Sequence, residues 1–357
     1  MYKALLFTVF IMISATACMP EETAPDLFAC RPVRDAAPML DFATYGLTTE
    51  NNTETPIQAP TDGTWPTRPI TIIVPFLAGG DTDIYARMLA PYLTEILGQP
   101  VHVINIDGMG GAVGTAHVHE AEPDGYTVLF YHSGSLFSNA LAGSTPLNYS
   151  DFVMSCVVVR CDANVMLINA GLGVNDAEAF IALAKNHPNE LSVAVTNTGF
   201  SGLLMQMAER AGDFELHHVD VGGAALMIQA VLNSHANATN VNVALYAPHA
   251  NNDALIPIWI SSSQRNPSLP HVPTLAEVGI ENGYIGRSYF FAFPENTDEY
   301  IAQKLSDAVG QITGNQEFIQ QLLNVISLPP QFVPFDEVTT YMHERWMELS
   351  DFNMGDS

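Results

Sequence analysis

The chain has 357 residues, of which 48% are hydrophobic, and 38 acidic residues against 12 basic ones give it a formal net charge of -26. This length suffices for two domains with hydrophobic cores, and the composition excludes collagen-like, coiled-coil and wholly disordered chains. A chain this acidic repels a phosphate backbone, so nucleic-acid binding is excluded as well.

The acidic excess has two explanations that the sequence leaves open. One is adaptation to a saline exterior, because dissolved salt screens self-repulsion between like charges. The other is a drift to low isoelectric point with no adaptive meaning. Thermal melts in low and high NaCl would separate them, since only adaptation predicts a midpoint that rises with salt.

Residues 1–18 have the features of an export signal. Lys3 precedes an apolar run over residues 4–17 that is too short to span a bilayer but typical of a secretory signal peptide. The small residues at 15–17 stand directly before Cys18 and resemble a bacterial lipobox, so we expect lipidation of Cys18 and attachment to a membrane from the periplasm. Cleavage without lipidation is the alternative.

Residues 19–64 are rich in Pro, Thr, Asn and acidic residues and lack helical or strand periodicity, so we expect an acidic tether. The folded body then begins at Trp65. Beyond the tether, apolar β-branched runs alternate with helical patterns, and Gly98 is expected to end the first helix. Strands are predicted at residues 70–75, 101–105, 126–131, 165–168, 191–195, 217–221, 241–246, 256–260 and 289–293. Helices are predicted at 84–97, 115–122, 176–186, 224–233, 298–313, 317–324 and 336–349, and a further helix is predicted after Ser201.

This alternation predicts an α/β fold with mainly parallel sheets covered by helices on both faces, with ligands at the carboxyl ends of the strands. Two α/β lobes are the simplest arrangement of so many units.

The cysteines belong to a chain that is expected to be exported. Cys156 and Cys161 are five residues apart, and in an oxidising compartment we expect a disulfide between them across a tight turn, with a free pair as the alternative. The partner of Cys30 is left open. No CxxC pair accompanies these residues, so no zinc or other metal site is expected.

The common enzyme motifs are incomplete in this chain. The glycine-rich segment at residues 108–114 does not fit GxGxxG, and residues 199–203 lack the last glycine of GxSxG. No nucleophile, base and orienting group can be assembled, so we expect no enzyme activity and no cofactor.

Several segments, in one order, resemble the tripartite tricarboxylate transporter substrate-binding proteins, the Bug or TctC-type receptors. They are WPTRPITIIVPFLAGGDTD at residues 65–83, LGQPV at 97–101, Asn105 with Gly110, Gly111 and Gly114, PDGYT at 123–127 and RNPSLPHVPTLAEVG at 265–279. The resemblance covers residues 65–346.

The resemblance implies a type II-like periplasmic binding protein, with two α/β lobes joined by crossover strands and a ligand cleft between them. Lobe 1 would comprise residues 65–163 and 286–357, and lobe 2 residues 164–285. Such a receptor, expected as a monomer, captures a small carboxylate and delivers it to the integral-membrane permease subunits of a tripartite transporter. The candidate ligand-binding residues are Phe76, Ala78, Gly79, Gly80, Asp83, Asn105, Gly110, Gly111, Ser133, Thr198, Gly199 and Ser201.

Physical chemistry suggests how such a cleft would hold an anion. In so acidic a protein the overall field repels a carboxylate, so attraction must come from main-chain N–H groups in the two glycine turns and from helix N-termini. The alternative is that these glycines only permit positive φ in tight connections.

Two departures from the family pattern change the expected charge of the cleft. The family commonly has Tyr-Lys before the Gly-Gly that stands here at 222–223, and often has Asp near the position of Tyr246. The ligand of a family member therefore cannot be transferred to this chain. A sensory receptor acting through a signalling partner, and a receptor that has lost binding, remain alternatives.

Overall fold

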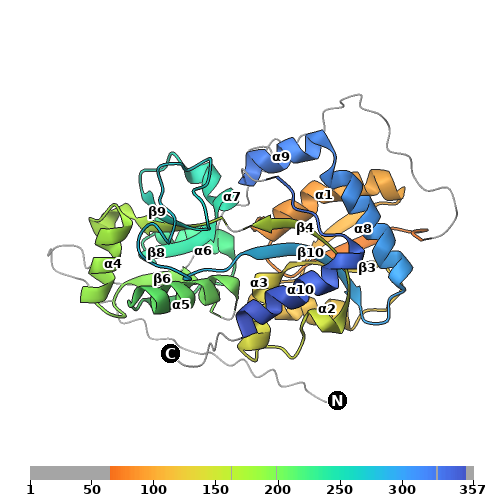
Figure 1. The fold of residues 1–357 in the computed structure, drawn as a ribbon, viewed down its shortest axis with the longest axis horizontal. Coiled ribbons are helices and arrows are strands. Elements are labelled where there is room, and N and C mark those ends of the chain that lie inside the picture. The colour runs from red at the N-terminus through yellow and green to blue at the C-terminus, as the bar shows by residue number, and fades with distance from the viewer. Residues whose placement is uncertain (1–64, 162, 198, 327–328, 351–357) are drawn as a thin grey trace, which may run out of the picture.

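The structure is a computed structural model that describes residues 65–161, 163–197, 199–326 and 329–350. The predicted signal peptide, Cys18, the tether with Cys30, and Thr198 lie outside the described residues. Two five-stranded sheets form the centres of two lobes that lie side by side (Figure 1).

The first sheet has the order β2-β1-β3-β10-β4. Its strands are β1 (Ile70–Val74), β2 (Val101–Asn105), β3 (Thr127–His132), β4 (Phe152–Cys161) and β10 (Arg287–Pro294). The helices that belong with it are α1 (Asp81–Leu97), α2 (Ala112–His119), α3 (Ser133–Leu141), α8 (Glu299–Thr313) and α10 (Phe335–Ser350). The C-terminal helices α8 and α10 thus return to the first lobe, as Figure 1 shows.

The second sheet has the order β7-β6-β8-β5-β9. Its strands are β5 (Asn164–Asn169), β6 (Ser192–Val195), β7 (His217–Asp220), β8 (Ala238–Asn242) and β9 (Leu255–Ser261). Its helices are α4 (Ala177–Asn186), α5 (Phe200–Gly212) and α6 (Ala224–Leu232), while α7 (Val243–Tyr246) and α9 (Gln316–Ile326) contact each other. The two lobes are joined by β4 continuing into β5 and by the chain from β9 to β10.

Local sequence explains most element boundaries. The first helix ends as predicted at Gly98, whose φ of 68° is left-handed and whose N–H bonds back to the Thr94 carbonyl. Asp176 caps α4 by accepting a hydrogen bond from the Ala179 amide. The single strand predicted over residues 241–246 is wrong from Val243 on, because the Asn242 side chain accepts from the Ala244 amide and starts a short helix.

Both sheets are mixed rather than mainly parallel. In the first, β10 runs antiparallel to β3 and β4, and in the second, β5 runs antiparallel to β8 and β9. β10 enters the first sheet from the second lobe, and β5 enters the second sheet from the first lobe. Each of these two strands runs against its neighbours, which explains the antiparallel pairs.

Cys156 and Cys161 do not form the predicted disulfide, and both side chains are buried. Both residues lie on β4, a long strand that periodicity does not predict, so no tight turn separates them. Five residues of extended strand span about 16 Å, whereas a disulfide tolerates about 7 Å between Cα atoms. Burial raises the pKa of the Cys156 thiol to about 12.

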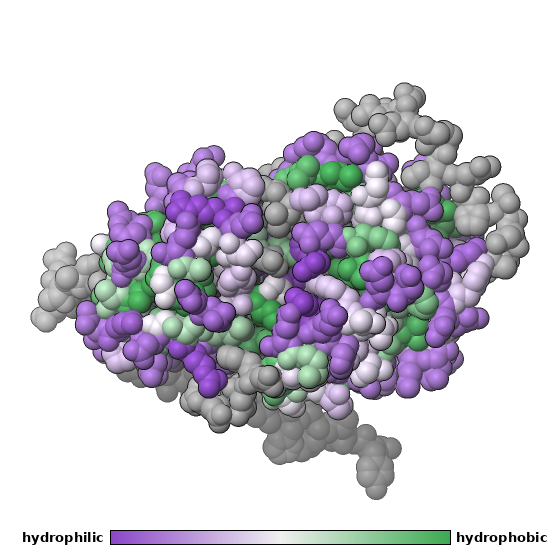
Figure 2. Space-filling view, viewed as in Figure 1, coloured by the Kyte–Doolittle hydropathy of each residue, from purple (hydrophilic) through white to green (hydrophobic). Residues whose placement is uncertain are grey.

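The face of the molecule seen in Figure 2 is predominantly hydrophilic, with hydrophobic side chains in small separate patches. None of the helices in the part of the chain described here has the length and apolar content needed to cross a bilayer.

Candidate functional site

A cavity lies between the two lobes at the carboxyl ends of the parallel strands. Its walls come from the β1–α1 turn, the start of α3 and the start of β10 in the first lobe, and from β5, β8 and the starts of α5 and α6 in the second. Its volume is about 60 Å³, several times the roughly 10–15 Å³ that one water molecule needs. The cavity suits a small ligand.

Three helices begin at this cavity, and each begins after a glycine. Gly80, Gly199 and Gly223 are the N-cap residues of α1, α5 and α6, and as glycines they have no side chain that could cap the helix. All three glycines line the cavity. Because a helix N-terminus carries free N–H groups and about half a positive charge, the cavity is lined by three positive helix ends.

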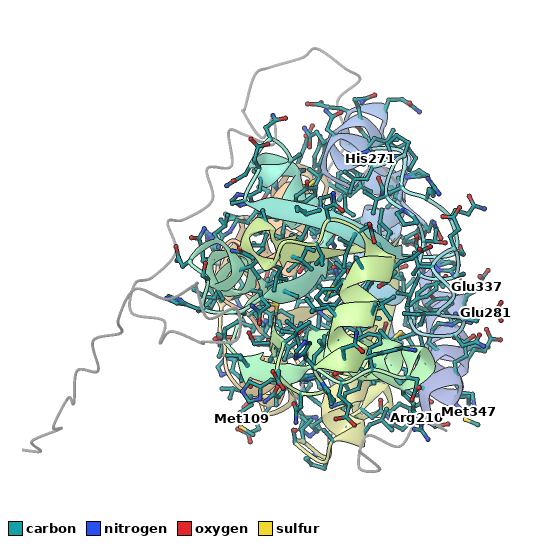
Figure 3. All side chains as sticks on the ribbon, turned by 90° about the vertical axis from the view of Figure 1, so that its left-hand side faces the viewer. Met109, Arg210, His271, Glu281, Glu337 and Met347 are labelled. Carbon is teal, nitrogen blue, oxygen red and sulfur yellow. The ribbon has the colours of Figure 1, made fainter. Side chains whose placement is uncertain are left out.

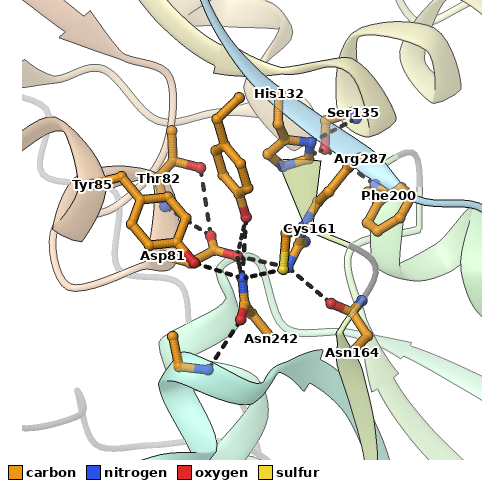
Figure 4. A network of polar contacts seen from close by, with 12 residues as sticks. Asp81, Thr82, Tyr85, His132, Ser135, Cys161, Asn164, Phe200, Asn242 and Arg287 are labelled. Atoms are coloured by element: carbon orange, nitrogen blue, oxygen red, sulfur yellow. Dashed lines mark hydrogen bonds and ion pairs between the residues drawn. The ribbon is translucent and has the colours of Figure 1, made fainter. Parts of the chain in front are cut away.

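A buried ion pair lies in the wall of the cavity, and Figure 4 shows its polar contacts. The Nη2 atom of Arg287 lies 2.8 Å from Oδ2 of Asp81, and both residues are 6% exposed. The same Asp81 oxygen accepts from the Tyr289 hydroxyl at 2.7 Å and from Asn242 Nδ2 at 3.1 Å. Arg287 Nη2 also donates to Asn164 Oδ1. These partners come from α1, from β10, and from β5 and β8 of the second lobe.

The protonation states in this cluster follow from burial and from the neighbouring charges. Burial alone would raise the pKa of the Asp81 carboxyl, but the Arg287 guanidinium and the hydrogen bonds from Tyr289 and Asn242 outweigh it and lower that pKa. Burial, together with the Arg287 charge, lowers the pKa of His132 to about 3. Asp81 is therefore ionised and His132 neutral at pH 7.

Within the described part of the chain, two buried polar atoms in the cavity wall have no hydrogen-bond partner. They are Oδ1 of Asn240 and Nε of Arg287, on residues that are 1% and 6% exposed. A buried polar atom without a partner costs free energy, so a ligand or water that supplies the partner is favoured here.

Phe200, the first residue of α5, packs deeply into the first lobe. Its ring centroid lies 5.7 Å from that of His132 and 5.0 Å from the Arg287 Cζ atom. A Cβ on Gly134 would stand 2.2 Å from the Phe200 ring, so only glycine fits opposite it. The Phe200 amide also donates to the Ser135 hydroxyl at 3.1 Å. These contacts hold the lobes together over the cavity.

The first predicted glycine turn reaches the cavity in part. Phe76 and Gly80 line the cavity, whereas Ala78 is exposed and is not part of the wall. Gly80 is the N-cap of α1, so Asp81 and Asp83 both lie within the first turn of that helix.

Asp83, Asn105 and Gly79 brace this turn from behind. The Gly79 amide donates to Asp83 Oδ2 at 2.9 Å, and Asn105 Nδ2 donates to Asp83 Oδ1 and to the Phe76 carbonyl. Arg87 donates to both Asp83 and Asn105. The side chains predicted as ligand contacts thus fix the shape of the turn in this structure.

The second glycine turn does not line the cavity. The Gly111 amide donates to the Gly108 carbonyl, and the Gly110 carbonyl accepts from Tyr131 and Asn139. The Met109 side chain between them is 61% exposed and points away from the body in Figure 3. The main-chain amides that sequence reasoning sought at this turn are provided instead by the starts of α5 and α6.

Gly111 gives a stability prediction. Its φ is +102°, and a Cβ there would stand 2.3 Å from the Tyr131 hydroxyl. We expect Gly111→Ala to lower the free energy of unfolding by about 2–4 kcal/mol through backbone strain and overpacking. Gly143→Ala is the matched control, because Gly143 has φ +67° and a Cβ added there would meet no atom within 4 Å. Equal urea midpoints for the two variants would contradict the expected steric contribution.

Of the remaining predicted residues, two line the cavity and one links neighbouring elements instead. Gly199 and Ser201 line the cavity, and the Ser201 hydroxyl accepts from the Thr196 amide. The Ser133 hydroxyl accepts from the Ser288 amide and ties α3 to β10; Ser135, two residues later, stands in the wall instead.

Sequence reasoning missed the polar centre of the site, which comprises Asp81, His132, Asn240, Asn242 and Arg287. One signal was available, since Arg287 is a charged residue at the start of the otherwise apolar run RSYFFAFP. A buried arginine requires an acidic partner. Asp81 lies 206 positions earlier in the chain, and nothing in the local pattern links the two.

The chain is similar in sequence to a family of receptors. Residues 85–331 match the family model described as the tripartite tricarboxylate transporter family receptor. The chain is 29% identical over 293 residues to protein BugT of Bordetella pertussis, covering 79% of this chain and 88% of that protein. It is 30% identical over 258 residues to a protein of the gbd 5′ region in Cupriavidus necator, covering 71% and 76%.

Solved structures share the fold. A Rhodopseudomonas palustris protein with adipate matches at TM-score 0.75 and 25% identity, covering 80% of this chain and 97% of that one. MatC of the same organism, with bound malate, matches at TM-score 0.73 and 23% identity, covering 80% and 100%. The two-lobed periplasmic binding protein fold expected from the sequence is confirmed. Because the family model spans more than two thirds of the residues, the chain belongs to the tripartite tricarboxylate transporter family of receptors.

Proposed function

We propose that the protein is an extracytoplasmic receptor that binds a small carboxylate in the interlobe cavity and delivers it to the permease subunits of a tripartite tricarboxylate-type transporter. The observation that carries this proposal is the meeting of the glycine-capped α5 and α6 N-termini at a cavity whose wall holds unpartnered buried polar atoms. Such helix ends are anion-binding sites.

The relatives support the same class of ligand. The similar Rhodopseudomonas structure contains adipate, a carboxylate. In keeping with a receptor that serves a membrane transporter, we further propose that residues 1–18 direct export and that lipid on Cys18 holds the protein at the membrane, with residues 19–64 as the tether. The mass of the mature N-terminal peptide tests this, because an unmodified cysteine there would exclude the anchor.

Isothermal titration of the mature protein against a panel of mono-, di- and tricarboxylates tests the proposal. The protein is first freed of any co-purified ligand by unfolding and refolding, and the recovered fold is checked by circular dichroism. Binding of at least one panel member supports the receptor function. No heat with any member, from a correctly refolded sample, contradicts it.

A charge placed at the α6 N-terminus tests the site itself. Ala225 lines the cavity in the first turn of α6. We expect Ala225→Asp to weaken carboxylate binding at least tenfold, because its carboxylate competes with the ligand for the positive helix end, while the helix itself tolerates an acid there. Ala225→Asn, whose new side chain has the same shape without the charge, should lose much less affinity for the carboxylate. Equal affinities of the two variants would place the ligand elsewhere.

A further inference from the structure

One of the three positive helix ends is already occupied by the chain itself. Asp81 is the first residue of α1, and its Oδ1 accepts a hydrogen bond from the Thr82 amide at 2.8 Å. An acidic group at this point satisfies the helix N-terminus as a bound anion would. The α1 end of the cavity therefore has little attraction left for a ligand carboxylate.

The basic side chain of the cavity, Arg287, is likewise already paired with an acidic group of the chain. Arg287 is the only Lys or Arg among the described residues that line the cavity, and its Nη2 is paired with Asp81 Oδ2 at 2.8 Å. The two Asp81 oxygens also accept from the Thr82 hydroxyl, Tyr289 and Asn242. The Asp81 oxygens therefore have their hydrogen-bond donors, and the charges of Asp81 and Arg287 cancel without a ligand. Only the Arg287 Nε–H is left without an acceptor among the described residues.

The charges facing the cavity therefore sum to about one positive charge. Asp81 and Arg287 cancel, and His132 is neutral because burial and the Arg287 charge hold its pKa at about 3. The N-termini of α5 and α6 remain, each equivalent to about half a positive charge. One carboxylate matches this total, whereas a second would be buried without compensation.

Part of the remaining cavity wall suits an apolar group. Phe76, Leu77, Phe200, Met227 and Val241 contribute to it beside polar residues such as Ser135, Ser201 and Asn240, and the volume of about 60 Å³ suits a short chain. Apolar atoms placed against these side chains are removed from water, which favours binding.

We propose, on the basis of the receptor function proposed above, that the cavity selects a small monocarboxylate with a short apolar remainder. Asp81 determines this selectivity, because its side chain occupies the place on Arg287 and α1 that a second ligand carboxylate would take.

The test compares ligands of equal chain length on the wild-type protein and on Asp81→Asn. The probes are butyrate against succinate and valerate against glutarate, measured by isothermal titration at constant ionic strength. We expect the wild type to bind each monocarboxylate at least tenfold more tightly than its dicarboxylate partner. In Asp81→Asn the freed Arg287 should attract the second carboxylate, so the affinity for succinate or glutarate should rise at least tenfold.

Thermal melting gives a second readout on the same variant. Asp81→Asn leaves Arg287 buried without its anion, so its melting midpoint should fall and then recover with a dicarboxylate more than with a monocarboxylate. The control is the double variant Asp81→Asn with Arg287→Gln, which removes both charges and should show neither the gain in affinity nor the selective recovery. If Asp81→Asn does not fold, the wild-type preference decides the ligand class.

The outcomes separate this inference from the receptor function. Wild-type affinity for dicarboxylates equal to or above that for monocarboxylates overturns the proposed selectivity and leaves the receptor function standing. A folded Asp81→Asn variant without gain for dicarboxylates overturns the role of Asp81. No binding of any carboxylate to the wild type overturns both the receptor function and the inference.

Discussion

Replacing Arg287 by methionine is expected to lower the free energy of unfolding by about 3–5 kcal/mol, the usual cost of leaving one member of a buried ion pair alone. The Asp81 carboxylate would keep its hydrogen bonds from Thr82, Tyr289 and Asn242 but lose the cation 2.8 Å away. Methionine has a similar length to the arginine stem, so the loss reflects charge more than packing. Urea unfolding at pH 7 measures the effect.

The pH dependence of this loss distinguishes a charge effect from a cavity effect. In the wild type the pKa of Asp81 is lowered in the folded state, so its contribution to stability is full above the unfolded pKa of about 3.9 and is lost as pH falls through the folded value. Without Arg287, burial raises the pKa of Asp81, and the folded protein then binds the proton more readily than the unfolded chain. The deficit of Arg287→Met should therefore shrink as the pH is lowered from 7 to 5.

The double variant Asp81→Asn with Arg287→Met is the control, since removing both charges is much less costly than removing one. It should recover part of the lost stability and show no pH-dependent deficit. A single variant within about 1 kcal/mol of wild type, against the 3–5 kcal/mol expected for a buried pair, would mean that water reaches the Asp81 carboxylate.

The second large effect is an acid-induced loss of stability that depends on His132. Its side chain accepts a hydrogen bond from the Ser135 amide through Nδ1 and is 3% exposed. Its pKa is about 3 in the folded protein, against about 6.5 for an unperturbed histidine. Between these two pKa values, His132 therefore binds a proton in the unfolded chain but not in the folded protein.

The sign and the pH window follow from these two values. The contribution of neutral His132 is full above pH 6.5 and is lost as the pH falls toward 3, at up to about 1.4 kcal/mol per pH unit. By pH 4.5 the loss amounts to roughly 2–3 kcal/mol. His132→Asn should flatten the stability profile between pH 6.5 and 4.5, since asparagine can cap α3 in the same way without titrating.

Unfolding midpoints across this pH range measure the difference between variant and wild type. His271→Asn is a suitable control, because His271, labelled in Figure 3, is exposed and its replacement should keep the wild-type profile. Parallel profiles for His132→Asn and wild type would show that His132 is hydrated or protonated in the folded protein.

Both predictions concern residues in the cavity wall, where side chains of the two lobes meet. Phe200 packs on Arg287 and His132, and Asn242 bonds to Asp81. Protonation or charge removal in this cluster therefore disturbs the contacts by which the second lobe covers the ligand space. We therefore expect these replacements to change both the stability of the protein and its affinity at the proposed ligand site.

Local structure and family membership could both be predicted from the order of the amino acids. Periodicity and caps placed most strands and helices of both lobes to within a few residues, as at Gly98 and Asp176, because these signals act over one or two turns of chain. They did not predict α3 or β4, and they extended one strand into the short helix α7. The order of short motifs from residue 65 to residue 279 was enough to indicate the receptor family that the comparisons then showed.

The groups that meet at the cavity were brought together by the folding of the whole chain. The pairing of Asp81 with Arg287 and the packing of Phe200 against Gly134 join residues more than sixty positions apart. The long strand β4 likewise follows from its place between β10 and the second lobe, and it separates the two cysteines expected to pair. The burial and the net charge of a site depend on residues from distant segments of the chain. The local sequence therefore predicted the glycine turns, whereas only the folded structure determined the charge balance of the cavity.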